Sequence, residues 1–250
     1  MNSRRFSKLI SIFQVLSALF MFWLLGYTLF RSMDNDLINH IEVIIFYLPL
    51  LLLLLLSIFP IFILSLKHRV TVAEGSLIPI YLFFISMSSV AYIPSIEEYI
   101  GITMLPYVFN QKLFFFFLLC TEIVLFFAAV INYDNTNTSR HHNIYAGLGI
   151  ATALIIAIKL PLNSNRHMPN SHSMGIWLVA FSIMLLGLMT YFANFLKDKE
   201  SYALKRFFTF VFLSLGHMII IAGFFPVTLL GAIFYFIRIA MLCLVSPHGY

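Results

Sequence analysis

Charged residues are scarce in this chain: only 10% of its 250 residues are Asp, Glu, Lys or Arg, while 61% are hydrophobic. A soluble globular domain typically carries about 25% charged residues, so this composition excludes an ordinary soluble protein. Apolar runs of about 20 residues recur along the chain, and each can cross a hydrocarbon core of about 30 Å as a helix. The sequence therefore predicts an all-α, polytopic helical membrane protein.

Cysteine is also rare, with Cys120 and Cys243 both inside apolar runs. Two such residues form no disulfide framework and match no zinc-binding pattern. Hydrolase and nucleotide motifs are missing too, since the chain has no G-x-S-x-G, no H-E-x-x-H and no phosphate-binding glycine loop. We therefore expect no metal and no cofactor, and we favour a non-catalytic role over an enzymatic one.

The apolar runs predict eight membrane spans. The last two are separated only by Gly223 and Pro226, and we expect them to form a tight hairpin, because one helix over 207–245 is too long for a bilayer. The eight runs cover 9–30, 41–66, 77–93, 113–131, 144–160, 174–196, 207–224 and 227–245.

The distribution of Lys and Arg between the loops predicts the orientation. Counted on alternate sides of the eight runs, one side carries ten basic residues and the other carries four. Basic residues are enriched in cytoplasmic loops, so both termini should be cytoplasmic, and 94–112 and 161–173 should face a lumen or the outside. The net charge is +5, but because these basic residues sit in short loops they report orientation and not nucleic acid binding. The ten are Arg4, Arg5, Lys8, Lys67, Arg69, Arg140, Lys197, Lys199, Lys205 and Arg206, and the four are Arg31, Lys112, Lys159 and Arg166.

Three ionisable residues fall near the middle of predicted spans: Glu122, His217 and Arg238. Burying a charge in hydrocarbon is costly, so such residues usually face the bundle interior and pair with one another. One interpretation is a functional Glu122–Arg238 ion pair with His217 as a proton-handling neighbour. The other is a neutralised structural pair beside a hydrogen-bonded histidine.

Small residues recur at four-residue spacing in the fifth span, at Gly149, Ala153 and Ala157. This spacing lets two membrane helices approach closely. We expect a packing face inside the bundle, with a homodimer contact as the alternative.

Acids and prolines interrupt the apolar pattern in AYIPSIEEYIGITMLPYVF, residues 91–109. The predicted orientation places this stretch on the non-cytoplasmic side, where Glu97 and Glu98 should face water or lipid headgroups. The run 99–109 is too short to span, so it should lie flat at the interface or enter the membrane as a re-entrant segment.

From residue 77 onward the order of features resembles the DRAM/FRAG/SFK family, which includes damage-regulated autophagy modulators and a Golgi factor in GPI-anchor lipid remodelling. A family motif in the loop after the first of six spans, P-x-(I/V)-S followed by glycine, is similar to Pro94-Ser95-Ile96-Glu97 and Gly101, although Glu97 replaces the usual serine. A second lumenal loop ends at His172, in HSMGIWLVAF, and the cytosolic ESYALKRFFTF also resembles the remodelling branch.

The resemblance implies a six-helix transmembrane core over 77–250, preceded by an N-terminal two-helix hairpin over 1–76 that has no counterpart in the family. It also implies residence in Golgi, ER or lysosomal membranes. The expected function is that of an accessory factor in lipid handling, such as GPI-anchor lipid remodelling or a related trafficking or autophagy role. Its partners would be membrane lipids, GPI-anchored proteins or another membrane subunit.

Two other function classes remain open. A small transporter or channel subunit would use Glu122, His217 and Arg238 along a pathway through the membrane. A membrane sensor or anchor subunit would need a partner to supply its output, because the chain has no soluble domain of its own.

Overall fold

The computed structural model describes residues 77–94, 97, 101, 105–134, 139–162, 171–199, 201–222, 230–237 and scattered positions between 9 and 30, and it shows no strand among them. Most of the two predicted N-terminal spans lies outside this set, so the division into 1–76 and 77–250 stays a prediction. A helical stretch also covers 230–237. The named elements are α3 (Ile78–Met87), the 3₁₀ helix η2 (Ser88–Tyr92), α5 (Tyr107–Asp134), α6 (Ser139–Lys159), α7 (Ser171–Asp198) and α8 (Ser201–Ala222).

Three of the described helices are long and apolar enough to cross a membrane: Tyr107–Ile131, Met174–Lys197 and Ala203–Ile221. Shorter apolar helices cover Ile80–Ala91 and Gly147–Lys159. Large apolar side chains are exposed along α6 and α7, which is the surface expected of helices in contact with lipid. The described part is therefore compatible with an integral membrane protein.

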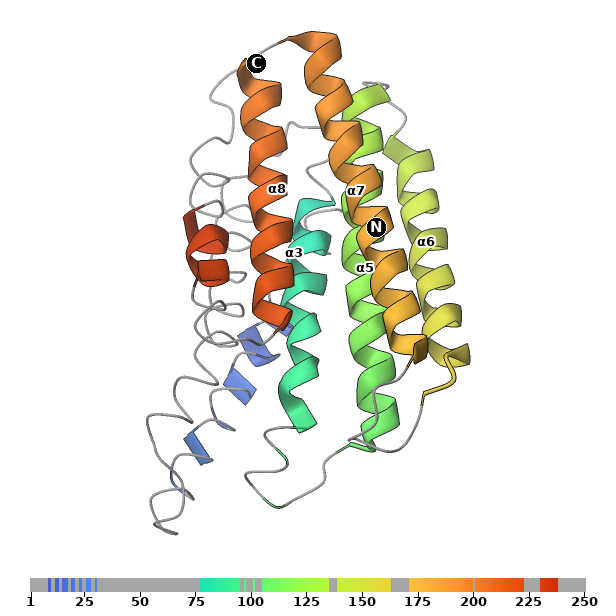
Figure 1. Ribbon diagram of the computed structural model, residues 1–250, viewed down its shortest axis with the longest axis vertical. Coiled ribbons are helices and arrows are strands. Elements are labelled where there is room, and N and C mark those ends of the chain that lie inside the picture. The colour runs from blue at the N-terminus through green and yellow to red at the C-terminus, as the bar shows by residue number, and fades with distance from the viewer. Residues whose placement is uncertain are drawn as a thin grey trace.

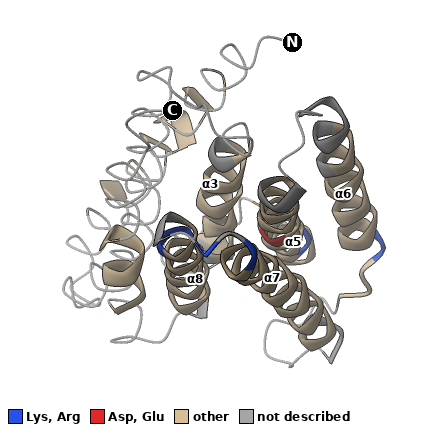
Figure 2. Ribbon diagram, turned by 90° about the horizontal axis from the view of Figure 1, so that it is seen from above, with Lys and Arg blue, Asp and Glu red and all other residues tan. Residues whose placement is uncertain are grey.

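The described helices alternate in direction. In Figure 1, α3, α6 and α8 run downward, whereas α5 and α7 run upward. Seen from above, α5 lies between α3, α6 and α7 (Figure 2). Lys159 and Lys197 stand in the last turns of α6 and α7. This alternation is the one required if consecutive runs cross the same membrane in turn.

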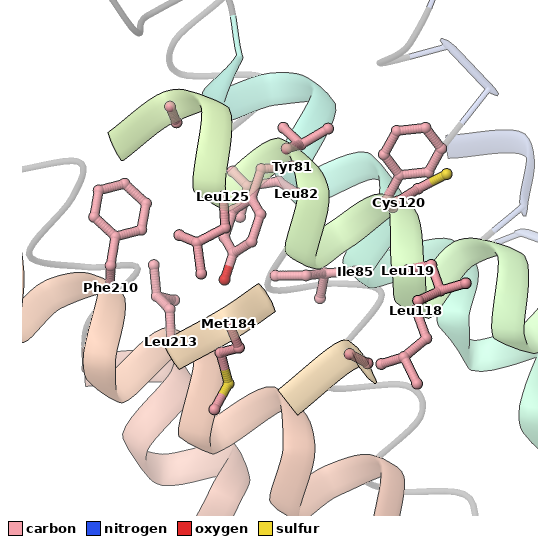
Figure 3. Close-up of a cluster of buried hydrophobic side chains, with 14 of the residues drawn as sticks. Tyr81, Leu82, Ile85, Leu118, Leu119, Cys120, Leu125, Met184, Phe210 and Leu213 are labelled. Carbon is pink, nitrogen blue, oxygen red and sulfur yellow. The ribbon is translucent and has the colours of Figure 1, made fainter. Parts of the chain in front are cut away.

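The core is centred on α5, which packs against α3, α6 and α7 and is the most buried of the three long apolar helices. Large side chains from four helices interdigitate around it, and Figure 3 shows Tyr81 and Ile85 of α3 beside Leu125 of α5 and Leu213 of α8. The sequence of α5 is apolar on all sides for most of its length, interrupted in the middle by Thr121 and Glu122, which matches this position because a helix with neighbours on several sides needs no polar face.

Serine side chains mark the change from α3 to η2. Pro79 stands in the first turn of α3, where its missing N–H breaks no hydrogen bond. At the other end, Ser86 Oγ donates to Phe83 O at 2.8 Å and Ser88 Oγ donates to Ile85 O at 2.6 Å. Bonds from a side chain to the carbonyl three residues earlier compete with the α-helical pattern, and the chain tightens into 3₁₀ geometry at this point.

Two helices, α5 and α7, begin several residues before the predicted spans at 113 and 174. Helix α5 begins at Tyr107, directly after Pro106, so Tyr107, Val108 and Phe109 belong to a membrane-type helix and not to a separate interfacial segment. Helix α7 begins at Ser171, so His172 lies in its first turn and not in the loop before it. Helical hydrogen bonds extend past an apolar run because the backbone needs partners whatever the side chains are.

The connection between α7 and α8 is a tight turn at Lys199. This residue has φ 52°, in the left-handed region, and its N–H donates to Phe195 O at 2.8 Å. A left-handed residue commonly ends a helix in this way, although glycine is the usual choice. The turn brings the end of α7 to the start of α8, and the two helices pack side by side.

Candidate functional site

Two buried hydrogen bonds join α3 and η2 to α8. The Tyr81 hydroxyl lies 3.2 Å from Ser214 Oγ, and Ser88 Oγ lies 2.8 Å from His217 Nε2. Residues 81 and 88 are two helical turns apart, while 214 and 217 are one turn apart, so each pair of side chains lies on one face. The two helices therefore present matching polar positions to each other within an apolar core.

The hydrogen bonds of Ser88 fix the tautomer of His217. A serine hydroxyl has one proton, and Ser88 Oγ donates it to the carbonyl of Ile85 at 2.6 Å. The contact with His217 must then be donated by Nε2–H of the imidazole. In the neutral ring, Nδ1 is consequently a bare acceptor, and it has no hydrogen-bond partner within the described part of the chain.

Glu122 is the acidic member of the same core. Its side chain is 0% exposed, and it lies on the buried stripe of α5 between Leu118 and Leu125. Tyr81 and Glu122 are both buried, and their helices α3 and α5 pack against each other. Among the residues that the structure describes, neither carboxyl oxygen of Glu122 has a hydrogen-bond partner.

The helical stretch 230–237 supplies a second tyrosine. It crosses α8 at two glycines: a Cβ on Gly216 would lie 2.8 Å from Gly231 O, and one on Gly231 would lie 3.0 Å from Gly216 O. This close approach buries Tyr235 in the same core. We refer to Tyr81, Ser88, Glu122, Ser214, His217 and Tyr235 as the buried polar cluster.

The sequence predicted Glu122 and His217 as intramembrane polar residues, and the structure places both in the buried core. Arg238, the expected ion-pair partner of Glu122, lies outside the described residues, so that pairing stays a prediction. Sequence reasoning missed the other four members of the cluster. For Tyr81 and Ser88 the only signal was their spacing, seven residues apart in one apolar run. For Ser214 it was a position three residues before His217.

The predicted lumenal motif forms a closed turn. Glu97 accepts two backbone hydrogen bonds, from Gly101 N–H to its carbonyl at 2.8 Å and from Leu105 N–H to Oε1 at 2.7 Å. Gly101 has φ +73°, which only glycine adopts freely, and this explains a glycine at this position. The expectation that Glu97 faces water or headgroups is wrong, because its side chain is 4% exposed and serves to close the turn.

The other motif residues are only partly placed. Pro94 is half-buried and directly follows the η2 region, whereas Ser95 and Ile96 lie outside the described residues. The side chain of His172 is likewise outside them, although its backbone is in α7. A shared site of Pro94 and His172 therefore stays a prediction.

The predicted small-residue face of α6 lies against α5. Ala153 and Ala157 are buried, and a Cβ built on Gly149 would meet Ile123 Cγ2 at 2.5 Å and Phe127 Cε2 at 3.0 Å. On the same helix, a Cβ on Gly147 would meet nothing within 4 Å. Absence of a side chain at Gly149 is what lets α6 approach α5 this closely.

Asn110 is a buried polar residue outside the cluster. Asn110, in the first turn of α5, is 1% exposed, and neither its Oδ1 nor its Nδ2 has a hydrogen-bond partner in the described part. It lies twelve residues before Glu122 in the same helix.

No group of three or more His, Cys, Asp or Glu side chains is arranged to hold a metal ion among the described residues. Comparison of the chain with family models, with curated proteins and with solved structures gave no match.

Proposed function

We propose that this chain is a small membrane transporter whose solute-binding centre is the buried polar cluster. One observation supports the proposal above others: the carboxyl group of Glu122 lies fully buried in a membrane-type helix with no hydrogen-bond partner among the described residues. Ionisable residues inside membrane spans are rare and costly, and they typically mark pathways for solutes or ions.

A purely structural role explains the cluster less well. Buried polar groups in proteins are almost always hydrogen-bonded, and an apolar residue would pack at the same position at lower cost. Glu122 and His217 instead leave three polar atoms without a described partner: both oxygens of Glu122 and Nδ1 of His217. Small-molecule sites are lined mainly by apolar side chains with a small number of polar groups, and this core has that composition.

The test is flux through the purified full chain in liposomes. Radiolabelled amines, amino acids and sugars are offered to the wild-type protein and to Glu122→Gln, which keeps the size of the side chain and removes its charge. Thr121→Val is the matched control, because Thr121 is buried beside Glu122 but its hydroxyl is satisfied by Phe117 O at 2.9 Å. We expect at least one solute to enter in a manner that Glu122→Gln abolishes and Thr121→Val preserves. Absence of any Glu122-dependent flux rejects the proposal.

Lipid handling is the second candidate function, with the endomembrane location and the partners implied by the family resemblance. The observation that favours it is the closed turn from Glu97 to Leu105, in which Gly101 has a backbone conformation that suits the motif's glycine. A lipidomic comparison of cells with and without the protein, including GPI lipid composition, tests it. If lipid composition is unchanged while Glu122-dependent flux is found, the transporter proposal alone survives.

A further inference from the structure

The turn between α7 and α8 holds the one residue other than glycine that has a left-handed backbone in the described part of the chain. This residue is Lys199, with φ 52° and an exposed side chain. Glycine would adopt the same conformation without strain, so a lysine here lowers the stability of the turn. Strained backbone positions cluster where a side chain has a function. The strain at Lys199 therefore directs attention to the surface around its side chain.

Two more exposed lysines, Lys197 and Lys205, lie beside this turn. The apolar stretch of α7 ends at Lys197 and that of α8 begins at Ala203, so the turn lies just outside both membrane-type stretches. Lys205 comes four residues after the start of α8 at Ser201, which is a rise of about 6 Å. The three lysines are therefore gathered where the apolar surfaces of both helices stop.

Exposed aromatic rings lie next to these lysines, within the apolar stretches. The Phe192 and Phe207 rings meet across the two helices with centroids 5.3 Å apart, and the Phe207 and Phe208 rings are also 5.3 Å apart. Phe192 and Phe208 are each 42% exposed. We call Phe192, Phe207 and Phe208 the aromatic row. It lies five residues before Lys197 and two to three residues after Lys205, which is within about 8 Å along either helix.

The charge of the turn and the aromatic row together select a partner. Asp198 and Glu200 fall among the four basic residues of 197–206, so this stretch is net positive and attracts an anion. A soluble anion or an acidic protein would meet the lysines but would not cover the aromatic row. An anionic phospholipid covers both, because its headgroup reaches the lysines while its acyl chains lie along the rings.

We infer that this end of α7 and α8 is a docking site for an anionic phospholipid, whose headgroup is held by Lys197, Lys199 and Lys205 and whose acyl chains lie on the aromatic row. The site contains no residue of the buried polar cluster. The inference therefore goes beyond the proposed transport function and does not depend on it.

Native mass spectrometry of the full chain in detergent, titrated with single lipids, tests the inference. The probes are dioleoylphosphatidylglycerol, which is anionic, and dioleoylphosphatidylcholine, which has the same acyl chains and no net charge. The test variant combines Lys197→Gln, Lys199→Gln and Lys205→Gln, since glutamine removes the charge and is equally strained at position 199. Lys159→Gln is the matched control, because Lys159 is exposed in the last turn of α6, at the opposite end of the bundle (Figure 1).

We expect the wild type to bind phosphatidylglycerol at least about tenfold more tightly than phosphatidylcholine, since each lysine near a membrane surface strengthens attraction to anionic lipid about fivefold. The triple variant should lose at least about tenfold in affinity for phosphatidylglycerol, and Lys159→Gln should stay within about twofold of the wild type. Added sodium chloride should reduce the preference, because salt screens exposed charges. Glycerophosphoglycerol, which is the headgroup without acyl chains, should not displace the lipid.

Equal affinity of the wild-type protein for the two lipids overturns the inference, and this comparison needs no variant. A triple variant that keeps the preference overturns the location of the site. An equal loss in Lys159→Gln shows that overall charge is responsible and overturns it too. Displacement by the free headgroup overturns the lipid assignment in favour of a soluble anion. All these outcomes are independent of Glu122-dependent flux, which tests the proposed function separately.

Discussion

Ser88 and His217 are 129 positions apart in the chain, and their side chains meet at 2.8 Å between Oγ and Nε2 in the buried core. This contact joins the start of η2 to the middle of α8. Because Ser88 also donates to Ile85 O, its oxygen is the acceptor that holds the imidazole in one tautomer and one orientation.

Replacing Ser88 with alanine should therefore destabilise the bundle. The Nε2–H of His217 would lose its acceptor, and an unsatisfied buried donor costs about 1–3 kcal/mol. Thermal unfolding in detergent measures the effect. Ser182→Ala is the control, because its hydroxyl makes only a local bond to Leu178 O at 2.8 Å on an exposed face. Equal small losses for both variants would show that the contact with His217 contributes nothing to stability.

Glu122→Gln should keep or raise the thermal stability of the protein while abolishing its function. The carboxyl has no hydrogen-bond partner among the described residues, so its removal breaks no described bond. A loss of about 3–5 kcal/mol would instead reveal a buried partner beyond them. The ion pair with Arg238 expected from the sequence is the specific alternative, and a double-mutant cycle with Arg238→Met would then show strong coupling.

Gly149→Leu should force α6 away from α5, because even a single Cβ at this position would meet Ile123 Cγ2 at 2.5 Å. Overpacking of this kind typically costs about 1–3 kcal/mol. Gly147→Leu is the control on the same helix, where a Cβ has open space. Unfolding of both variants in detergent gives the comparison, and similar stabilities would refute the packing of Gly149 against α5.

Lys199→Gly should stabilise the turn between α7 and α8. Lysine at φ 52° is strained, and a left-handed conformation costs an L-residue about 1–2 kcal/mol. Lys197→Gly removes the same charge two residues earlier, inside α7, where glycine should destabilise by about 1 kcal/mol. The two variants should shift the melting temperature in opposite directions, and a shift of the same sign would contradict the role assigned to this turn.

The predicted orientation can be tested with cysteine labelling in a background without Cys120 and Cys243. Lys199→Cys and Ser139→Cys should react with an impermeant thiol reagent only from the cytoplasmic side, and Pro161→Cys only from the opposite side. The structure places these positions at helix ends on opposite sides of the bundle, consistent with the alternation in Figure 1. Labelling of Ser139→Cys from the lumenal side would overturn the assignment.

The sequence predicted the all-helical character of the described part, because long apolar runs have few other stable forms in a membrane. It also predicted that Glu122 and His217 would be inside. It did not predict that Tyr81, Ser88 and Ser214 would meet them, because a single serine or tyrosine in an apolar run looks the same whether it faces lipid or a neighbour. The burial of Glu97 was missed for a related reason: its partners are the backbone N–H groups of Gly101 and Leu105, and side-chain types do not show which backbone groups a turn brings to Glu97.

The five residues of η2 connect α3 to the segment that contains Glu97. A 3₁₀ residue rises about 2.0 Å and turns about 120°, whereas an α-helical residue rises about 1.5 Å and turns about 100°. Rewinding the whole segment would therefore shorten it by about 2.5 Å and rotate whatever follows by about 100°. Ser88 opens the segment and holds His217, and Pro94 comes soon after its end. Rewinding η2 while Ser88 stays bound to His217 would therefore change the position of the Glu97 turn.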